Sequence, residues 1–336
     1  MRSVIFFKRC FNKRPSFNID SIQDLPFSEN IELAYNFLQP KNARINLNKT
    51  PVLFLHGLFG SKLSFNSNGR ELTRIIHNPV YTVDLRNHGD SPHVLPHNYI
   101  TMAHDISKFI NDQKWNKCIL IGHSMGAKVA MLVSLLYSKL IEKLVVIDNT
   151  PHSQRLDDSY YNDLLAMCEI EHDSKEFKNG DMRIVDIDKV DDKLKDYEES
   201  SHVRSLLKSN LIRTKKDIER IPKNKQSTEA FKIPVMNFYK HNIIDSISSW
   251  PNLHVDKFNN PVLVMYGNQS KFVLPEYFKK FDEYFTNVKF QEFDTGHYIS
   301  VDDPLRFVHS LARFIEPKVE ESLQTHHKRH HIKVNK

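Results

Sequence analysis

The stretch that decides the fold is Gly122-His123-Ser124-Met125-Gly126. The apolar residues 118–121 come directly before it, and the largely apolar residues 128–137 follow it. The pattern predicts a strand, a sharp turn and a helix, with glycines that let strand and helix approach closely and tolerate the strained backbone between them. A serine on such a turn projects its hydroxyl above the sheet, so we interpret Ser124 as the nucleophile of a nucleophile elbow. A purely structural turn is the alternative.

Strands and helices alternate on both sides of this elbow. Apolar runs predict strands at 31–38, 51–55, 80–85, 117–121, 144–147, 261–267 and 288–293. Helical spacing fits 70–77, 101–113, 128–137, 275–285 and 305–315. This order predicts an α/β fold with a mostly parallel central sheet and helices on both faces, formed by residues 20–151 and 258–316. Between the two halves, residues 152–257 are polar, charge-rich and helical in spacing, and we interpret them as a lid inserted above the carboxyl ends of the strands.

Composition narrows the class of protein further. The 336 residues contain no run of 18 apolar residues, so no transmembrane helix is expected. The net charge of +6 belongs to the ends of the chain, because residues 1–19 carry +5 and residues 317–336 carry +3. The remaining body is weakly acidic, which argues against a nucleic-acid partner.

The two ends of the chain and the cysteines bear on its location. Residues 1–19 are basic, rich in Phe and free of acidic residues, which is typical of a mitochondrial presequence. A disordered basic tail is the alternative. The tail 317–336 is charged and contains four histidines; we interpret it as solvated and disordered, with metal binding as the alternative. The cysteines, Cys10, Cys118 and Cys168, show no paired spacing, which fits a reducing compartment without disulfides or a zinc site.

Glycine is scarce and unevenly distributed. Of nine glycines, seven follow or end predicted strands: Gly57, Gly60, Gly89, Gly122, Gly126, Gly267 and Gly296. Unusual backbone geometry is therefore needed at one edge of the sheet, where ligands bind in open α/β folds.

A serine nucleophile needs a base, a group that orients the base, and donors for the oxyanion. His297 follows the last strand on a glycine-containing turn, so it reaches the same edge as Ser124 and is the candidate general base. His56 and His123 belong to turns at this edge, and we interpret them as supporting residues.

The orienting acid is Asp148, which ends the strand after that of the nucleophile. In this architecture the acid commonly follows the strand at 261–267, but the loop 268–273 contains no carboxylate and offers only Ser270. The alternatives are a capping role for Asp148 and an acid role for Asp294.

Backbone amides complete the predicted site. Met125 supplies one oxyanion donor at the start of a helix, and the loop 56–60 supplies a second, which we assign to Leu58. We interpret Asp84 and Asp90 as turn residues, with a catalytic role as the alternative. In the lid, residues 204–225 hold eight basic and two acidic residues, which could attract an anionic acyl carrier such as coenzyme A; a solvated helical face is the alternative.

These residues together carry a family resemblance over about 30–315. The chain resembles the α/β-hydrolase superfamily, and more narrowly its mitochondrial branch with the yeast ethanol acetyltransferases and their mammalian relatives. The close matches are 59–62 (FGSK), 83–91 (VDLRNHGDS) and 123–128 (HSMGAK). In that branch the triad falls on Ser124, Asp148 and His297.

The resemblance implies synthesis of ethyl acetate from acetyl-CoA and ethanol or other short alcohols, with thioesterase and esterase side activities. It also implies mitochondrial residence and no metal, nucleotide or redox cofactor, so acetyl-CoA is a substrate rather than a cofactor. Two alternatives stay open. One is a mitochondrial carboxylesterase or acyl-thioesterase without useful transfer, and the other is a non-catalytic partner that stabilises a matrix enzyme complex.

Overall fold

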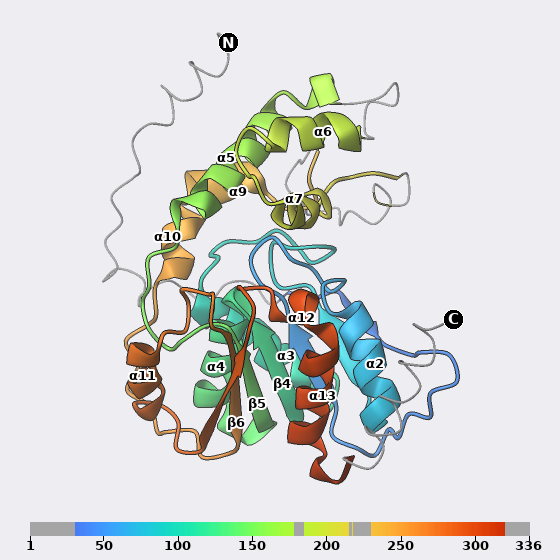
Figure 1. Ribbon diagram of the computed structural model, residues 1–336, viewed down its shortest axis with the longest axis vertical. Coiled ribbons are helices and arrows are strands. Elements are labelled where there is room, and N and C mark those ends of the chain that lie inside the picture. Colours follow the sequence, from blue (N-terminus) through green and yellow to red (C-terminus); the bar gives the residue numbers. More distant parts are fainter. Residues whose placement is uncertain (1–30, 178–184, 215–216, 218–229, 320–336) are drawn as a thin grey trace. The chain divides into compact units, whose positions relative to one another are not determined.

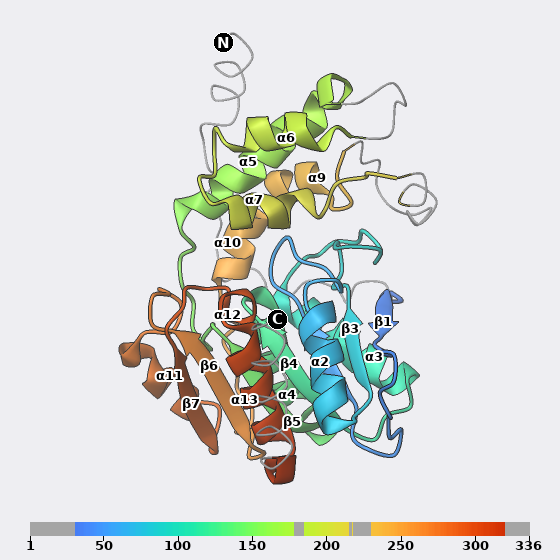
Figure 2. The ribbon, with the colours of Figure 1, turned by 45° about the vertical axis from the view of Figure 1, so that its right-hand side comes forward.

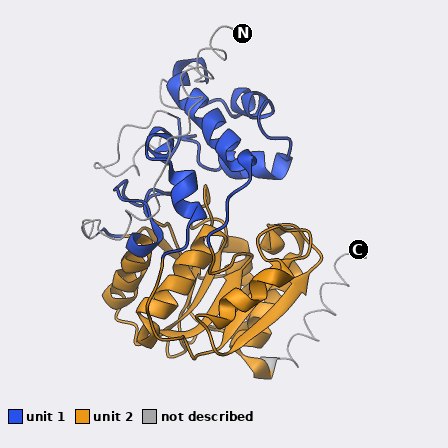
Figure 3. Ribbon diagram, turned by 90° about the vertical axis from the view of Figure 1, so that its left-hand side faces the viewer, with its two compact units in different colours: residues 1–32, 86–101, 153–251 blue, residues 33–85, 102–152, 252–336 orange. Residues whose placement is uncertain are grey.

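A computed structural model describes residues 31–177, 185–214, 217 and 230–319 of the chain. The chain divides into two compact units, which Figure 3 shows in different colours. One comprises residues 33–85, 102–152 and 252–336, and we call it the sheet unit. The other comprises residues 1–32, 86–101 and 153–251, and we call it the helical unit.

The sheet unit contains a seven-stranded sheet in the order β1-β3-β2-β4-β5-β6-β7. All neighbouring strands are parallel except β1, which pairs antiparallel with β3. The strands are β1 (Tyr35–Phe37), β2 (Val52–Leu55), β3 (Val80–Val83), β4 (Cys118–His123), β5 (Ile141–Ile147), β6 (Val262–Gly267) and β7 (Val288–Phe293). The predicted α/β fold with its mostly parallel sheet is therefore confirmed.

The central strands are apolar throughout because both of their faces are covered. Every residue of β2 is buried, and β4 and β6 are each buried at five of six positions. Strands covered on both faces read as continuous apolar runs rather than as alternating patterns. The edge strand β7 is less buried and carries Lys289, Gln291 and Glu292.

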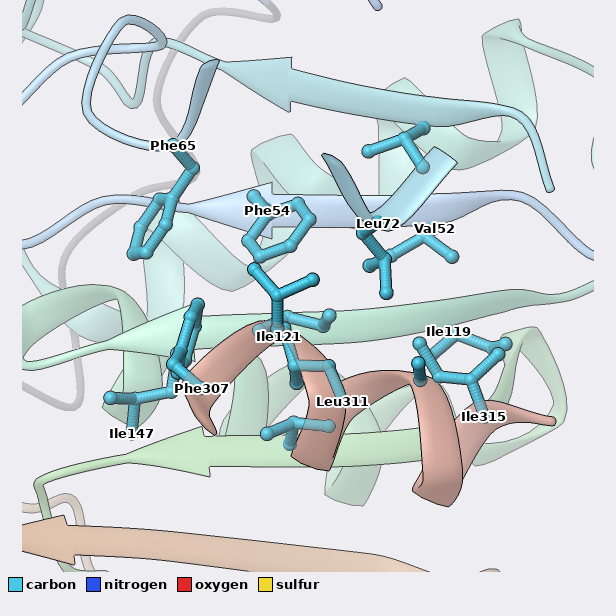
Figure 4. Close-up of a cluster of buried hydrophobic side chains, with 14 of the residues drawn as sticks. Val52, Phe54, Phe65, Leu72, Ile119, Ile121, Ile147, Phe307, Leu311 and Ile315 are labelled. Carbon is cyan, nitrogen blue, oxygen red and sulfur yellow. The ribbon is translucent and has the colours of Figure 1, made fainter. Parts of the chain in front are cut away.

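Two helices cover one face of this sheet. Helices α2 (Asn66–Ile76) and α13 (Pro304–Ile315) pack on each other and on the strands β2, β4 and β5. Figure 4 shows the side chains of this layer, with Phe307 and Leu311 of α13 against Ile121 of β4. The amphipathic pattern of α13 follows from this position, because one stripe of the helix faces the sheet.

Helix α4 (Met125–Leu136) lies on the opposite face, as Figures 1 and 2 show. It is apolar almost all round and buried from Met125 to Leu135, because it packs against both β4 and β5. Helix α3 (Tyr99–Asp112) lies on the same side as α4. Shorter elements complete the unit: η2 (Ser138–Leu140), η4 (Pro275–Tyr277), α11 (Phe278–Asp282), α12 (Ile299–Asp302) and η5 (Pro317–Val319).

Several predicted helix boundaries differ from the structure, by up to four residues. Helix α2 begins at Asn66, four residues before the predicted start, within a segment of weak helix formers. A tertiary contact contributes here, because the amide of Asn68 donates to the Ser300 carbonyl at 3.0 Å. The predicted helix 275–285 is divided into η4 and α11 and ends at Asp282.

The helical unit contains α5 (Asp158–His172), η3 (Ser174–Phe177), α6 (Ile187–Leu194), α7 (Ser201–Lys208), α9 (Val235–Lys240) and α10 (Ile243–Ser248). Asp157, Asp186 and Ser200 cap α5, α6 and α7 through their side-chain oxygens. Residues 86–101, which the sequence analysis placed with the sheet, join this unit; the Tyr99 hydroxyl donates to the Ile247 carbonyl at 2.7 Å. The role of the insertion as a lid stays a prediction.

Part of the predicted basic stretch pairs within the helical unit itself. Arg204 and Lys208 both bond Asp191, at 3.3 and 2.5 Å. Residues 215–216 and 218–225 of this stretch lie outside the described residues, as do the predicted presequence 1–19 and the histidines of the tail. Among the described helices, none is long and apolar enough to cross a membrane. The described cysteines, Cys118 and Cys168, are buried thiols.

Candidate active site

Ser124 occupies a strained position between β4 and α4. Its backbone has φ 53° and ψ −118°, a conformation that residues with a Cβ rarely adopt. Its N–H donates to the Ile147 carbonyl at 3.0 Å, which ties the turn to the neighbouring strand β5. The side chain stays largely buried, at 8% exposure for the residue. This geometry is that of the predicted elbow.

The elbow glycines are required by close backbone approach. A Cβ on Gly126 would lie 2.5 Å from the His56 carbonyl oxygen, and a Cβ on Gly122 would lie 2.1 Å from the Gly126 carbonyl oxygen. Neither obstacle is a side chain that can move aside. The strand, the turn and the helix can therefore pack together only with glycine at both positions.

The register of the parallel strands brings the predicted residues to one edge. His123 at the end of β4 pairs with Ile147 at the end of β5, so Ser124 and Asp148 follow neighbouring strand ends. The pair Gly267 and Phe293 ends β6 and β7 in the same way, and His297 follows β7 four residues later. Parallel strands that end together place their following loops side by side.

Asp148 is completely buried and accepts three hydrogen bonds. Its Oδ2 accepts from His297 Nδ1 at 2.6 Å and from the Ser270 hydroxyl at 2.5 Å, and its Oδ1 accepts from the Gly267 N–H at 3.2 Å. An ionised carboxylate only accepts, so Nδ1 of His297 carries the hydrogen and Nε2 keeps its lone pair. That tautomer is the one a general base needs.

Asp294, the alternative acid, does not take this position. It is exposed and accepts a hydrogen bond from the Gln269 side chain at 3.1 Å. It therefore shapes the turn before His297, while Asp148 contacts the imidazole.

Aromatic rings and a backbone bond fix the imidazole of His297 from several sides. The Phe272 ring stacks on it with centroids 4.3 Å apart and planes 25° apart. The His123 ring lies 4.7 Å away, and its Nε2–H donates to the His297 carbonyl at 2.9 Å. The Tyr298 ring meets it edge-on at 5.3 Å. His123 therefore links the elbow directly to the residue that carries the candidate base.

Burial keeps the two neighbouring histidines neutral. Burial, together with a smaller effect of the nearby His297, lowers the pKa of His123 to about 3. Burial also lowers the pKa of His56, against the opposing effect of Asp84. The Nδ1–H of His56 donates to the Gly57 carbonyl at 2.8 Å, and its Nε2 accepts from the Leu85 N–H at 3.0 Å. Both rings support the backbone of the site, as the sequence analysis expected from their turns.

The predicted oxyanion donors flank Ser124. Met125 is the first residue of α4, where N–H groups have no acceptor within the helix. The loop that carries Leu58 touches the nucleophile, because a Cβ on Gly57 would lie 3.1 Å from the Ser124 Cβ. Leu58 itself is buried at the centre of this loop. The oxyanion role of the two amides stays a prediction.

A buried ion pair holds the loop after Leu58. The Asp84 carboxylate accepts from the backbone N–H of Lys62 at 2.6 Å and from its ammonium at 2.5 Å. Asp84 is therefore a structural residue of this edge, in agreement with its interpretation as a turn residue. Lys128, one helical turn after Ser124, is also buried, and burial lowers its pKa to about 7.

No role for Ser270 or Phe272 was predicted from the sequence. Ser270 follows β6, where the acid commonly lies in this architecture. Its hydroxyl donates to Asp148, which follows β5. The absence of a carboxylate in the loop 268–273 was the available signal, and it indicated Asp148 rather than Ser270. The stacking of Phe272 depends on tertiary packing and has no sequence signature.

A strand–turn–helix serine, a histidine with the base tautomer and a buried carboxylate behind it are the parts that a Ser-His-Asp site requires, and their catalytic roles stay predictions. The sequence matches the model of the α/β hydrolase fold family over residues 50–304. The chain belongs to this family.

Curated relatives cover nearly the whole chain. Ethanol acetyltransferase 1 of Wickerhamomyces anomalus is 30% identical, covering 96% of this chain and 83% of that protein. Ethanol acetyltransferase 1 of Wickerhamomyces ciferrii is 33% identical, covering 90% of this chain and 79% of that protein. An abhydrolase domain-containing protein of Schizosaccharomyces pombe is 32% identical, covering 79% and 92%. These relationships support an acyltransferase or esterase activity.

Solved structures share the fold. A marine microorganism esterase superposes with a TM-score of 0.70 at 25% identity, covering 84% of this chain and 99% of that one. The thioesterase domain from the curacin biosynthetic pathway superposes with a TM-score of 0.52 at 19% identity, which concerns the fold alone.

Proposed function

We propose that this protein is a serine-dependent acyltransferase that makes acetate esters, ethyl acetate among them, from acetyl-CoA and ethanol through an acyl-serine intermediate. The observation that carries the chemistry is the contact of the buried Asp148 with His297, at the same edge of the sheet as the strained Ser124. The choice of substrates is supported by the identity of about 30% to the ethanol acetyltransferases over most of the chain.

In the acylation half-reaction, the Ser124 oxygen attacks the thioester carbonyl carbon while His297 Nε2 takes its proton. A hydrogen bond between the Ser124 hydroxyl and His297 Nε2 is expected to form when the substrate binds. The amides of Leu58 and Met125 receive the negative charge on the carbonyl oxygen. Collapse of the tetrahedral intermediate breaks the carbon–sulfur bond. The proton on His297 passes to the leaving sulfur, and acetyl-Ser124 and free coenzyme A remain.

In the second half-reaction an alcohol oxygen attacks the acetyl carbonyl carbon. His297 takes the proton of the alcohol and returns it to the Ser124 oxygen, which leaves as the ester is released. Water can enter the same step and yields acetate. Since water is present at about 55 M, an alcohol at about 50 mM needs a roughly 10³-fold kinetic preference, or about 4 kcal/mol, to compete equally.

The second candidate is a carboxylesterase or acyl-thioesterase without useful transfer. It has the same acylation step and differs only in the acceptor. The likeness to the marine microorganism esterase favours it, since that chain is matched over 99% of its length. Both candidates require Ser124, so the acceptor decides between them.

The test is an assay of the purified full chain with acetyl-CoA, with and without ethanol, in which free thiol and ethyl acetate are measured together. Ser124→Ala is the inactivating variant. Ser107→Ala is the matched control, because Ser107 is a buried serine on α3 whose hydroxyl donates to the His104 carbonyl of its own helix.

Ester formation that is lost in Ser124→Ala and kept in Ser107→Ala supports transfer. Thiol release without ester leaves the hydrolase. If neither product forms, or if Ser124→Ala keeps both, the proposal is wrong.

We also propose that the protein resides in mitochondria, on the support of the basic, acid-free residues 1–19. A fusion of these residues to a fluorescent protein tests this directly. Diffuse fluorescence outside mitochondria would contradict it.

A further inference from the structure

The loop after β6 contacts both the acid and the base of the site. The Ser270 hydroxyl donates to Asp148 Oδ2 at 2.5 Å, the same oxygen that accepts from His297 at 2.6 Å. The Ser270 oxygen in turn accepts from the N–H of Phe272 at 3.2 Å. The Phe272 ring stacks on His297. One three-residue segment, Ser270 to Phe272, therefore closes a ring of contacts around the Asp148–His297 pair.

These contacts supply hydrogen-bond donors that the buried carboxylate of Asp148 needs. A buried carboxylate is stable only when its oxygens are satisfied by donors, and Asp148 is completely buried. The Gly267 amide bonds Oδ1, while Oδ2 would otherwise face the imidazole alone. The hydroxyl of Ser270, itself 7% exposed, supplies the missing donor from the side of β6. Oδ2 of Asp148 thus accepts from both the Ser270 hydroxyl and Nδ1 of His297.

We propose that Ser270 is a positioning residue of the triad: its hydroxyl holds the Asp148 carboxylate in register with His297, and the same loop holds the imidazole through Phe272. This inference rests on the proposed catalytic role of Ser124, Asp148 and His297. The loop after β6 contains no carboxylate, and Ser270 in this loop instead supplies a hydrogen-bond donor to Asp148, the acid that follows the neighbouring strand β5.

A positioning role differs from a merely structural one in how it alters the reaction. A hydroxyl that donates to Oδ2 draws negative charge from the carboxylate. Without it the carboxylate interacts more strongly with a protonated His297, so the acidic limb of the kcat/KM profile moves to higher pH. The titratable rings in contact with His297 are those of His123 and Tyr298, and burial keeps His123 neutral over this range. A fall in kcat/KM with an unmoved pH profile is what loss of folded protein would give.

The experiment measures hydrolysis of p-nitrophenyl acetate by the full chain between pH 5 and 9, in the wild type, Ser270→Ala, Ser270→Thr and the control Ser107→Ala. For Ser270→Ala we expect kcat/KM to fall about tenfold or more and the acidic limb to rise by roughly half a pH unit to one unit. Ser270→Thr keeps the hydroxyl and is expected to keep the limb of the wild type. Ser107→Ala is expected to match the wild type in both.

A double-mutant cycle with Asp148→Asn tests whether Ser270 acts through Asp148. In the Asp148→Asn background, Ser270→Ala is expected to cost less than twofold, because the carboxylate that it positions is gone. An equal cost in both backgrounds would overturn the inference. So would an unmoved acidic limb in Ser270→Ala, or a limb in Ser270→Thr that moves as far as in Ser270→Ala.

These outcomes are distinct from failure of the proposed function. If the wild type does not hydrolyse p-nitrophenyl acetate, or if Ser124→Ala hydrolyses it equally well, the triad itself is refuted. If the wild type is active and Ser124→Ala is not, the result for Ser270 bears on the positioning role alone.

Discussion

Replacing Asp148 by asparagine removes one charge and leaves the local structure intact. Asp148 has φ 50°, in the left-handed region that Asn tolerates as well as Asp. The volume is unchanged. The substitution therefore changes the chemistry of two oxygen positions, each with a known partner.

The contacts decide how the new amide is oriented. Oδ1 accepts from the backbone N–H of Gly267, which can only donate. The asparagine oxygen must therefore occupy that position, and its NH₂ group takes the place of Oδ2, facing Ser270 and His297. The serine hydroxyl can turn to accept. The imidazole can accept at Nδ1 only by moving its hydrogen to Nε2, which is the wrong tautomer for a base.

Turnover should therefore fall about 10⁴-fold in Asp148→Asn, equivalent to about 5.5 kcal/mol of transition-state stabilisation. The assays are p-nitrophenyl acetate hydrolysis and thiol release from acetyl-CoA, with the thermal unfolding midpoint as a check on folding. Asp294→Asn is the matched control, since Asp294 is exposed and bonds Gln269. A folded Asp148→Asn variant within tenfold of the wild type would refute the reasoning and return the acid to another residue.

Three further predictions concern stability. Ser124→Gly and Ser124→Ala should both be inactive. The glycine variant should be more stable to denaturant by about 1 kcal/mol, because only glycine adopts φ 53° with ψ −118° without strain. Equal stabilities of the two variants would argue against a strained elbow. Gly126→Ala should destabilise the fold by about 3 kcal/mol or more, since its Cβ would lie 2.5 Å from a carbonyl oxygen, whereas Gly296→Ala, with nothing within 4 Å of its Cβ, should change stability by less than about 0.5 kcal/mol. The buried Lys128 has a pKa of about 7 in the folded state against an ordinary value of 10.5, so the unfolded state binds more protons between these pH values. The free energy of unfolding should therefore rise with pH in this range. Lys128→Met should flatten this rise, and identical pH dependence of the free energy of unfolding in the two proteins would contradict the assignment.

The arrangement of the candidate site could be predicted because it depends on chain order and strand periodicity. A parallel sheet collects the carboxyl ends of its strands at one edge, so residues that follow separate strands become neighbours. Asp148 and His297 were predicted from this rule to meet, and the structure places the two side chains 2.6 Å apart. Their catalytic roles, and those of Ser124, Leu58 and Met125, stay predictions for the assays above.

Local propensity failed where tertiary packing overrides it. The first turn of α2, at Asn66 to Asn68, has little helix preference, but the contact of Asn68 with the Ser300 carbonyl helps to hold it. The segment 275–285 has helical spacing throughout, yet it forms a turn of 3₁₀ helix followed by a short α-helix. Neither difference displaces a residue of the candidate site.

The sequence by itself determined the class of fold, the elbow around Ser124 and the edge of the sheet at which its partners gather. It could do so because strand–helix alternation and the glycines of a tight turn are local patterns with few structural solutions. Only the tertiary structure decided which groups complete the site: that Ser270 donates to Asp148, that Phe272 stacks on His297, and that His123 donates to the His297 carbonyl. These contacts join segments that are distant along the chain. Their geometry follows from strand register and packing, which no spacing along the sequence encodes.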